Sequence, residues 1–268
     1  ADRARVVRSG RVSIEFESMR IEPGYRRVAA ALTERILDRS LPAGEHLPPE
    51  VELARQLGVH RSTVREALRE LETNGLLERR RGSKRMVVTR PDNDAVAGSV
   101  RRALSLHDVS YRDVWEAMTM LEPPLAEAAA RRREPAALVA LENAAEAFRV
   151  HNSEDQTVAT TEAVREVAGF FRQLGNCVRN PVLILAQEPL LQLLEPSLDA
   201  MIDRVPQARA RIVTAERRIV EAVRERDASA ARDWMAKHIR DFKRGYELAG
   251  MSLARSIGSH SPTAREPN

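Results

Sequence analysis

The chain has 268 residues, of which 43% are hydrophobic and 4% aromatic. This composition excludes a disordered chain and suits two domains with aliphatic, helical cores. Residues 1–90 carry 19 Lys and Arg against 13 Asp and Glu, whereas residues 91–268 carry 24 against 26. Because phosphate neutralisation supplies most non-specific affinity for DNA, this asymmetry predicts a nucleic-acid module followed by a near-neutral domain.

The single cysteine, Cys177, excludes a disulfide within the chain. A small buried apolar side chain is a better interpretation of it than a catalytic thiol. The sequence contains no membrane-spanning run, and its N-terminal residues lack the apolar core of a signal peptide. We therefore expect a soluble, cytoplasmic and nucleoid-associated protein with no membrane partner.

The first 40 residues divide into an arm and a helix. Residues 1–22 are arginine-rich, and a brief alternation of apolar and polar residues there is typical of a strand or of a mobile arm. Residues 25–40 predict a helix that ends before Pro42 and supports the segment after it. The apolar face of this helix consists of Val28, Ala31, Leu32, Ile36 and Leu37.

Residues 49–77 contain two short amphipathic segments on either side of Gly58. Gly58 can take the left-handed backbone conformation that ends a helix. Two helices joined by so short a turn cross at a steep angle, which predicts a helix-turn-helix. The two apolar stripes are Leu53, Ala54 and Leu57, then Val64, Ala67, Leu68 and Leu71.

The second amphipathic segment carries the candidate DNA-contacting residues at the N-terminal end of its polar face. Recognition helices place such residues against base edges in the major groove. Arginine suits this role because its planar guanidinium can donate two hydrogen bonds to guanine O6 and N7. The candidates are His60, Arg61, Ser62, Thr63 and Arg65.

After the turn signal Asn74-Gly75, residues 76–88 predict two short strands around a basic tip, Arg81–Lys84, that would lie on phosphate. Amphipathic helix pairs are common, and a run such as Glu78–Arg81 is usually only a solvated face. The ordered conjunction of a supporting helix, a turn, an arginine-bearing helix and a basic hairpin is more specific, and it indicates DNA binding.

Turn-forming and charged residues at 90–94 mark a domain boundary. The predicted fold class is mostly α: an N-terminal winged helix-turn-helix with a small β-hairpin wing, followed by an all-α antiparallel bundle. The predicted parts are an N-terminal arm over 1–22, a winged-helix DNA-binding domain over 23–91, an all-helical effector-binding and dimerisation domain over 92–250, and a flexible tail over 251–268.

From residue 94 onward, helical periods are separated by proline, asparagine or aspartate. Pro123 and Pro124 should kink the second predicted helix, and Pro189 and Pro196 are candidates to break the fifth, because proline removes a backbone donor. The predicted helices are Asp94–Leu106, Tyr111–Arg132, Pro135–Val150, Asp155–Val178, Pro181–Asp203, Gln207–Arg226 and Ala228–Ala249.

Several motifs within residues 25–90 carry a family resemblance. They are Leu47-Pro48-Pro49-Glu50, Leu53-Ala54, Leu57-Gly58-Val59, the run from Arg61 to Arg69, and Leu71-Glu72 followed by Gly75-Leu76. In this order they resemble the winged helix of GntR-type bacterial transcriptional regulators. The resemblance implies that Arg61 and Arg65 read bases, that Ser62 and Thr63 contact bases or phosphate, and that Gly82 approaches the minor groove. The other wing-tip candidates are Ser83 and Lys84.

Two positions depart from the pattern of that family. Val51 stands where many members carry an arginine that touches DNA. His60 stands where Ser or Thr usually caps the recognition helix. The operator sequence therefore does not follow from the resemblance.

The second half resembles the FadR-type C-terminal domain of the same regulators. The motifs that carry this resemblance are Tyr111–Ala117 with Leu121-Glu122, Phe170–Leu174 ahead of Asn180–Leu183, Glu216–Val223, Ala230 and Met235–His238. Many such domains hold a divalent metal through an Asp and a His four apart and one His from each of the last two helices. The corresponding positions here are Val167, Phe171, Arg217 and His238. Since one ligand of four is present, we expect no metal and no other cofactor.

The same resemblance predicts the chemistry of an effector. Met118 stands where many members carry an arginine that binds a small carboxylate. With Met118, Val167 and Phe171 turned inward, the cavity would be apolar, and Arg217 and His238 would be its polar groups. This favours a fatty acid, an acyl-CoA or a related lipid intermediate whose anionic end meets Arg217. Alternatively, Val167 and Phe171 fill the hollow and leave no pocket.

The expected function is a transcriptional regulator, with repression as the first hypothesis. It would bind a near-palindromic double-stranded DNA operator as a homodimer, because one winged helix reads only a few base pairs. The alternatives are an architectural DNA-binding protein without an effector, and an enzyme that the winged helix targets to DNA. The sequence shows no glycine-rich phosphate loop and no catalytic triad pattern, which disfavours an enzyme.

Overall fold

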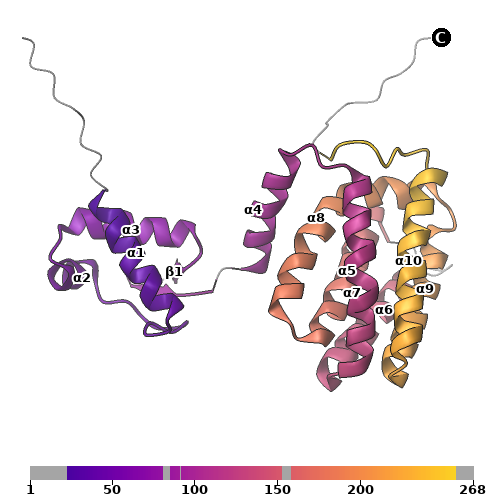
Figure 1. The fold of residues 1–268 in the computed structure, drawn as a ribbon, viewed down its shortest axis with the longest axis horizontal. Coiled ribbons are helices and arrows are strands. Elements are labelled where there is room, and N and C mark those ends of the chain that lie inside the picture. The colour runs from indigo at the N-terminus through magenta and orange to yellow at the C-terminus, as the bar shows by residue number, and fades with distance from the viewer. Residues whose placement is uncertain (1–22, 81–84, 91, 153–157, 258–268) are drawn as a thin grey trace, which may run out of the picture. The chain divides into compact units, whose positions relative to one another are not determined.

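The computed structural model describes residues 23–80, 85–90, 92–152 and 158–257. The chain divides into two compact units, Ala1–Pro91 and Asp92–Asn268. The described residues form ten helices and one two-stranded antiparallel sheet, which confirms the mostly α fold class (Figure 1). None of the described helices has the length and apolar character needed to cross a membrane.

The first unit is a three-helix domain with a hairpin. Its elements are α1 (Gly24–Leu37), α2 (Glu50–Leu57), α3 (Arg61–Thr73), β1 (Leu77–Arg79) and β2 (Met86–Val88). α3 packs against both α1 and α2, because its stripe of Val64, Ala67, Leu68 and Leu71 is buried. Gly58 ends α2 with a φ of 64°, the left-handed conformation expected from the sequence.

The buried face of α1 differs from the predicted one. Val28, Ala29 and Leu32 are buried, whereas Ala31 is exposed and Leu37 is 72% exposed. The buried positions follow the spacing of one helix face, and residues 31 and 37 lie off that face. The prediction that Ala31 and Leu37 belong to the core was therefore wrong.

The hairpin forms with Leu77 opposite Val88 and Arg79 opposite Met86. A segment before α2 pairs with the other edge of β2: Leu47 N–H donates to Met86 O at 2.9 Å, and Val88 N–H donates to Glu45 O at 2.9 Å. Leu47 is thereby buried at 1% exposure. No apolar alternation marks this segment as a strand, but its pairing protects an otherwise open strand edge.

The second unit consists of seven helices. They are α4 (Asn93–Ser105), α5 (Tyr111–Arg132), α6 (Pro135–His151), α7 (Thr160–Val178), α8 (Pro181–Arg204), α9 (Ala208–Glu225) and α10 (Ala228–Leu248). Helices α5 to α10 surround one apolar core, and α4 packs against α8 (Figure 1). α10 packs against its neighbours α5 and α9.

Two sequence-based predictions for this unit need correction. α7 begins at Thr160 rather than Asp155, because Ala159 has an extended backbone. α8 runs unbroken through Pro189 and Pro196, whereas α5 has the predicted bounds with Pro123 and Pro124 inside it. Pro189 is buried, so packing around it holds the helix despite the lost backbone donor.

The predicted flexible tail is partly fixed. Arg112 N–H donates to Leu253 O at 2.8 Å, and Ile257 N–H donates to Val109 O at 2.9 Å. These backbone bonds attach residues 251–257 to the start of α5, which short polar sequence patterns do not reveal. Residues 258–268 lie outside the described part of the chain, as does the N-terminal arm.

A buried polar contact joins α5, α7 and α8. Gln187 Nε2 donates to Glu122 Oε1 at 3.0 Å and to the Phe171 carbonyl oxygen at 3.0 Å. A Cβ at Gly175 would lie 2.6 Å from Gln187 Oε1, so glycine makes room for this side chain. Burial raises the pKa of the Glu122 carboxyl to about 8, against a small opposing effect of the Gln187 hydrogen bond.

We predict that the Glu122→Gln variant loses part of the pH dependence of stability. Between about pH 4.5 and about pH 8 the folded wild type holds a proton on Glu122 that the unfolded chain has released, so its free energy of unfolding falls as pH rises. An amide does not titrate. Denaturant unfolding at a series of pH values should show a shallower decline in the free energy of unfolding for the variant. A difference of one pKa unit between the folded and unfolded states corresponds to about 1.4 kcal/mol.

Glu127→Gln is the matched control on the same helix. The hydrogen bond from Arg232, against burial, lowers the pKa of Glu127, so this carboxylate stabilises the fold above its ordinary pKa and loses that effect only as pH falls. The control variant should therefore keep the wild-type decline toward alkaline pH. Equal slopes for Glu122→Gln and wild type would show that Glu122 is not protonated in the fold.

Candidate functional site

Two arginines project from the first two turns of α3. Arg61 and Arg65 are four residues apart, which places them on one helix face. Their side chains are 59% and 46% exposed. The helix carries them because its opposite face, from Val64 to Leu71, is buried against α1 and α2. The arrangement presents two neighbouring guanidinium groups to solvent.

A carboxylate from α2 holds both arginines. Glu50 Oε2 accepts hydrogen bonds from Arg61 Nε at 3.0 Å and from Arg65 Nε at 3.3 Å and Nη2 at 3.2 Å. The Glu50 side chain is 21% exposed. Burial disfavours its charged form, but hydrogen bonds from Arg65 and then Arg61 outweigh burial and hold the pKa of Glu50 below its ordinary value. Glu50 is therefore anionic at neutral pH.

The remaining candidates on the helix surround this pair. His60 and Ser62 are exposed, and Thr63 is half-buried. Within the described residues, the His60 side chain accepts no capping hydrogen bond from α3, although His60 occupies the N-cap position. Val51 is 61% exposed on α2 and offers an apolar surface where an arginine was expected from the family pattern.

Sequence reasoning missed two further arginines beside this pair, Arg69 and Arg79. A hollow of about 270 Å³ lies beside the arginine pair and is lined by Glu50, Arg65, Leu68, Arg69, Glu72 and Arg79. Arg69 lies one turn beyond Arg65 on α3, and Arg79 ends β1. The i, i+4 spacing of Arg61, Arg65 and Arg69 was the available signal. The wing-tip candidates Gly82, Ser83 and Lys84 lie outside the described residues.

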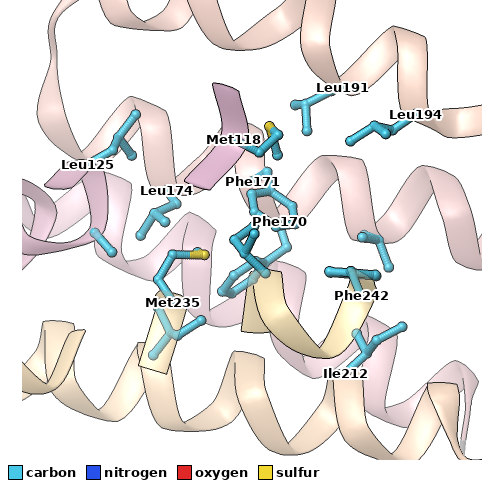
Figure 2. Packing of buried hydrophobic residues seen from close by; sticks show 14 of the residues in the cluster. Met118, Leu125, Phe170, Phe171, Leu174, Leu191, Leu194, Ile212, Met235 and Phe242 are labelled. Carbon is cyan, nitrogen blue, oxygen red and sulfur yellow. The ribbon is translucent and has the colours of Figure 1, made fainter. Parts of the chain in front are cut away.

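In the helical unit, four of the five predicted effector-contacting residues are buried. Met118, Val167, Phe171 and His238 are each 2% exposed or less. The Phe171 and His238 rings stack with centroids 5.7 Å apart. Figure 2 shows Met118 and Phe171 within one cluster of buried side chains from several helices. The structure thus brings these residues into the bundle core, but Met118, Val167 and Phe171 fill it with their side chains and do not line the cavity beside His238.

The fifth residue, Arg217, does not point into the bundle. Its side chain is 58% exposed, and its Nε lies 3.9 Å from Glu221 Oε1. The buried stripe of α9 runs through Ile212, Glu216 and Ile219, and residue 217 is turned by about 100° from residue 216. The prediction that Arg217 supplies the cation of an internal pocket was therefore wrong, and Glu216 takes the inward position.

Glu216 is the unusual group of this core. It is 0% exposed, and within the described residues neither carboxylate oxygen has a hydrogen-bond partner. Burial, together with the charge of Glu166, raises the pKa of Glu216 well above its ordinary value. Glu166 itself pairs with His151, whose Nδ1 lies 2.5 Å from Glu166 Oε1.

His238 is the second buried polar group without a partner. Among the described residues its Nε2 has no hydrogen-bond partner, and burial lowers the pKa of its imidazole to about 3. His238 also lines a cavity of about 20 Å³, roughly the space of one water molecule. The other lining residues are Met201, Val205, Ala208, Arg211, Ile212, Asp241, Phe242, Gly245 and Leu248.

The residues at the expected metal positions do not fit a metal ion. Val167 and Phe171 offer no ligand atom, Arg217 is a cation, and His238 is the one possible ligand among the four. Moreover, the described residues contain no group of three His, Cys, Asp or Glu that could hold a metal ion. Cys177 is buried, and burial raises the pKa of its thiol to about 11, as suits a core residue.

Comparisons with known families match both units. Residues 24–87 match the family described as bacterial regulatory proteins, gntR family. Residues 113–241 match the FCD domain. The first match contains Glu50, Arg61 and Arg65, and the second contains Glu216 and His238.

Individual relatives agree. A putative L-lactate dehydrogenase operon regulatory protein of Escherichia coli (strain K12) is 29% identical over 259 residues, covering 91% of this chain and 98% of that protein. The Glc operon transcriptional activator of the same strain is 26% identical, covering 85% and 92%. The solved structure of Streptococcus agalactiae GntR has a TM-score of 0.59 and 28% identity, covering 82% of this chain and 99% of that one.

Both units and the full-length relatives lead to one assignment. The chain belongs to the gntR family of bacterial regulatory proteins and is a transcriptional regulator with a GntR-type helix-turn-helix domain followed by an FCD domain.

Proposed function

We propose that this regulator is a homodimeric repressor that binds a near-palindromic operator and responds to a small effector in its FCD domain. The observation that carries the DNA-binding part is the exposed pair Arg61 and Arg65 on the first two turns of α3. Each guanidinium can donate two hydrogen bonds to guanine in the major groove. Ser62, His60 and the N–H groups at the start of α3 would contact phosphate.

Dimerisation follows from the size of the reading surface. One recognition helix contacts only a few base pairs, and two copies related by two-fold symmetry double both the contact and the operator length. Effector binding would have to stabilise one arrangement of the dimer more than another to change operator affinity. Repression is the simplest outcome, since a bound dimer blocks access to the DNA beneath it.

The Arg65→Ala variant tests the DNA-binding part. We expect it to lose specific binding to duplexes that the wild-type protein selects from a randomised library, because one bidentate base contact is worth about 1–3 kcal/mol. Fluorescence anisotropy with a selected and a scrambled duplex measures the loss. Arg131→Ala, which removes an exposed arginine of α5 paired with Glu127, is the control.

Two readouts accompany that experiment. Size-exclusion chromatography with light scattering should give the same dimer mass for Arg65→Ala and wild type. If Arg65→Ala keeps specific binding, α3 is not the reading helix. If wild type selects no sequence at all, the architectural alternative replaces the operator-specific one.

The chemistry of the effector follows from the groups inside the bundle. A fatty acid or acyl-CoA was expected on the basis of an internal Arg217, which is instead on the surface. Among the described residues of this unit, the buried polar groups without a hydrogen-bond partner are the Glu216 carboxyl, His238 Nε2, Trp115 Nε1 and one oxygen of Asp199. Of these, the Glu216 carboxyl is the titratable acid deepest in the core. A buried carboxyl without a partner is costly, and a hydrogen-bond donor or a cation would relieve that cost. We therefore propose an effector with a donor or cationic head and an apolar body, which would have to widen the one-water cavity beside His238 in order to enter the core.

Thermal-shift measurements with three six-carbon probes of one shape test this proposal. We expect n-hexylammonium to raise the melting temperature, n-hexanol to raise it less and n-hexanoate not to raise it, because a ligand stabilises only the state that it binds. The Glu216→Gln variant should lose the n-hexylammonium effect. A larger shift with n-hexanoate would restore the lipid hypothesis, and no shift with any probe would support an effector-independent protein.

We also propose that the protein needs no metal and no other cofactor. The single potential ligand at the four family positions supports this. Elemental analysis of protein purified without a histidine tag should give much less than one zinc, nickel or manganese ion per chain. One tightly held ion per chain that survives dialysis would overturn the proposal.

We propose no enzymatic activity for either unit. Two carboxyl groups of the core, Glu122 and Glu216, are fully buried, and the first is hydrogen-bonded to Gln187. A third buried carboxylate, Glu188, pairs with Arg172. The relatives reported above are named as transcriptional regulators. Both points support a role in binding rather than in catalysis.

A further inference from the structure

The ion pair between α2 and α3 concentrates three hydrogen bonds on one atom. Glu50 is the first residue of α2, and its Oε2 accepts from Arg61 Nε and from both Nε and Nη2 of Arg65. The two arginines therefore share a single carboxylate. Their side chains remain 59% and 46% exposed, so the contact does not bury them.

This geometry orients the free donors of the two guanidinium groups. Glu50 occupies the Nε side of each arginine. Within the described residues, both Nη groups of Arg61 and the Nη1 group of Arg65 make no hydrogen bond to protein. Arginine can contact guanine through two such end-on N–H groups while its Nε stays bonded to the carboxylate.

The charge of Glu50 also opposes a competing contact. A guanidinium that turns its Nε side to a phosphate oxygen must leave the carboxylate, and the carboxylate then lies unpaired close to the negative backbone of DNA. A guanidinium that contacts guanine keeps the ion pair and adds two hydrogen bonds. Phosphate contacts supply affinity without sequence information, whereas base contacts supply specificity.

We propose that Glu50 is a specificity-determining positioning residue. It holds Arg61 and Arg65 in position to contact guanine and disfavours their contact with phosphate. It acts through the two arginines and need not touch DNA. The inference rests on the DNA-binding function proposed above and deepens it. A purely structural role in tying α2 to α3 would instead change stability and leave the choice between DNA sequences unaltered.

The Glu50→Gln variant of the full chain tests the proposal, with Glu52→Gln as its control. Glu52 lies two residues away on the same helix, and its carboxylate pairs with Arg55 at 2.6 Å rather than with α3. Both variants remove one negative charge from α2. The probes are one duplex selected by the wild-type protein from a randomised library and a scrambled duplex of the same base composition.

For Glu50→Gln we expect weaker binding to the selected duplex and tighter binding to the scrambled one, with a discrimination ratio about tenfold lower than wild type, within the worth of one bidentate base contact. The affinity for the scrambled duplex should fall more steeply as the salt concentration rises, because arginines released from Glu50 neutralise additional phosphates. Glu52→Gln should keep the wild-type ratio and slope. Glu50→Asp, which keeps the charge but is shorter, should retain weak binding to the scrambled duplex.

The outcomes separate the possible failures. If Glu50→Gln and Glu52→Gln give the same ratio and the same salt slope, Glu50 does not control specificity and the inference is wrong, while the regulator function stands. If Glu50→Gln is less stable yet discriminates as wild type does, its role is structural and the inference is again wrong. If the wild type selects no duplex, the operator-binding function fails and this inference fails with it.

Discussion

Arg61 and Arg65 of the helix-turn-helix are held by an ion pair that crosses from α2 to α3. Two arginines one turn apart on α3 would repel each other if both were left without a counter-charge, and Glu50 supplies that charge from α2. The carboxylate is itself partly buried, and its pKa is lowered because the two arginines outweigh the effect of burial. The same contact crosses from α2 to α3, and within the described residues it leaves both Nη groups of Arg61 and the Nη1 group of Arg65 without a hydrogen bond to protein.

The helical unit follows a different physical rule. Its core is aliphatic and aromatic, and burial acts on two of the titratable groups inside it: it raises the pKa of Glu122 to about 8 and lowers the pKa of His238 to about 3. Gln187 satisfies the first of these groups. Glu216 and His238 Nε2 are left without partners among the described residues. A buried polar group without a partner costs stability, so these two positions are among the least satisfied of the core.

Sequence periodicity predicted most of the fold, because the apolar residues of a helix that buries one face recur with the helical period. It identified all seven helices of the second unit to within a few residues, except for the start of α7. It also placed Arg61 and Arg65 on the exposed face of α3, since the apolar residues around them follow the helical period. It failed where the outcome depended on a contact distant in sequence: the strand-like pairing of Leu47 with β2, and residues 251–257 against the start of α5.

The sequence by itself determined the order of the two units, the helix-turn-helix and the arginines on its polar face, because these depend on local spacing and composition. The tertiary structure decided which side chains face each other. It turned Arg217 outward and Glu216 inward. Neighbouring residues of a helix differ by about 100° in direction, so the core contains a carboxyl group where a guanidinium was expected. It also brought Glu50 to the two arginines 11 and 15 residues later, which spacing alone could not show, because the angle between α2 and α3 is set by their shared core.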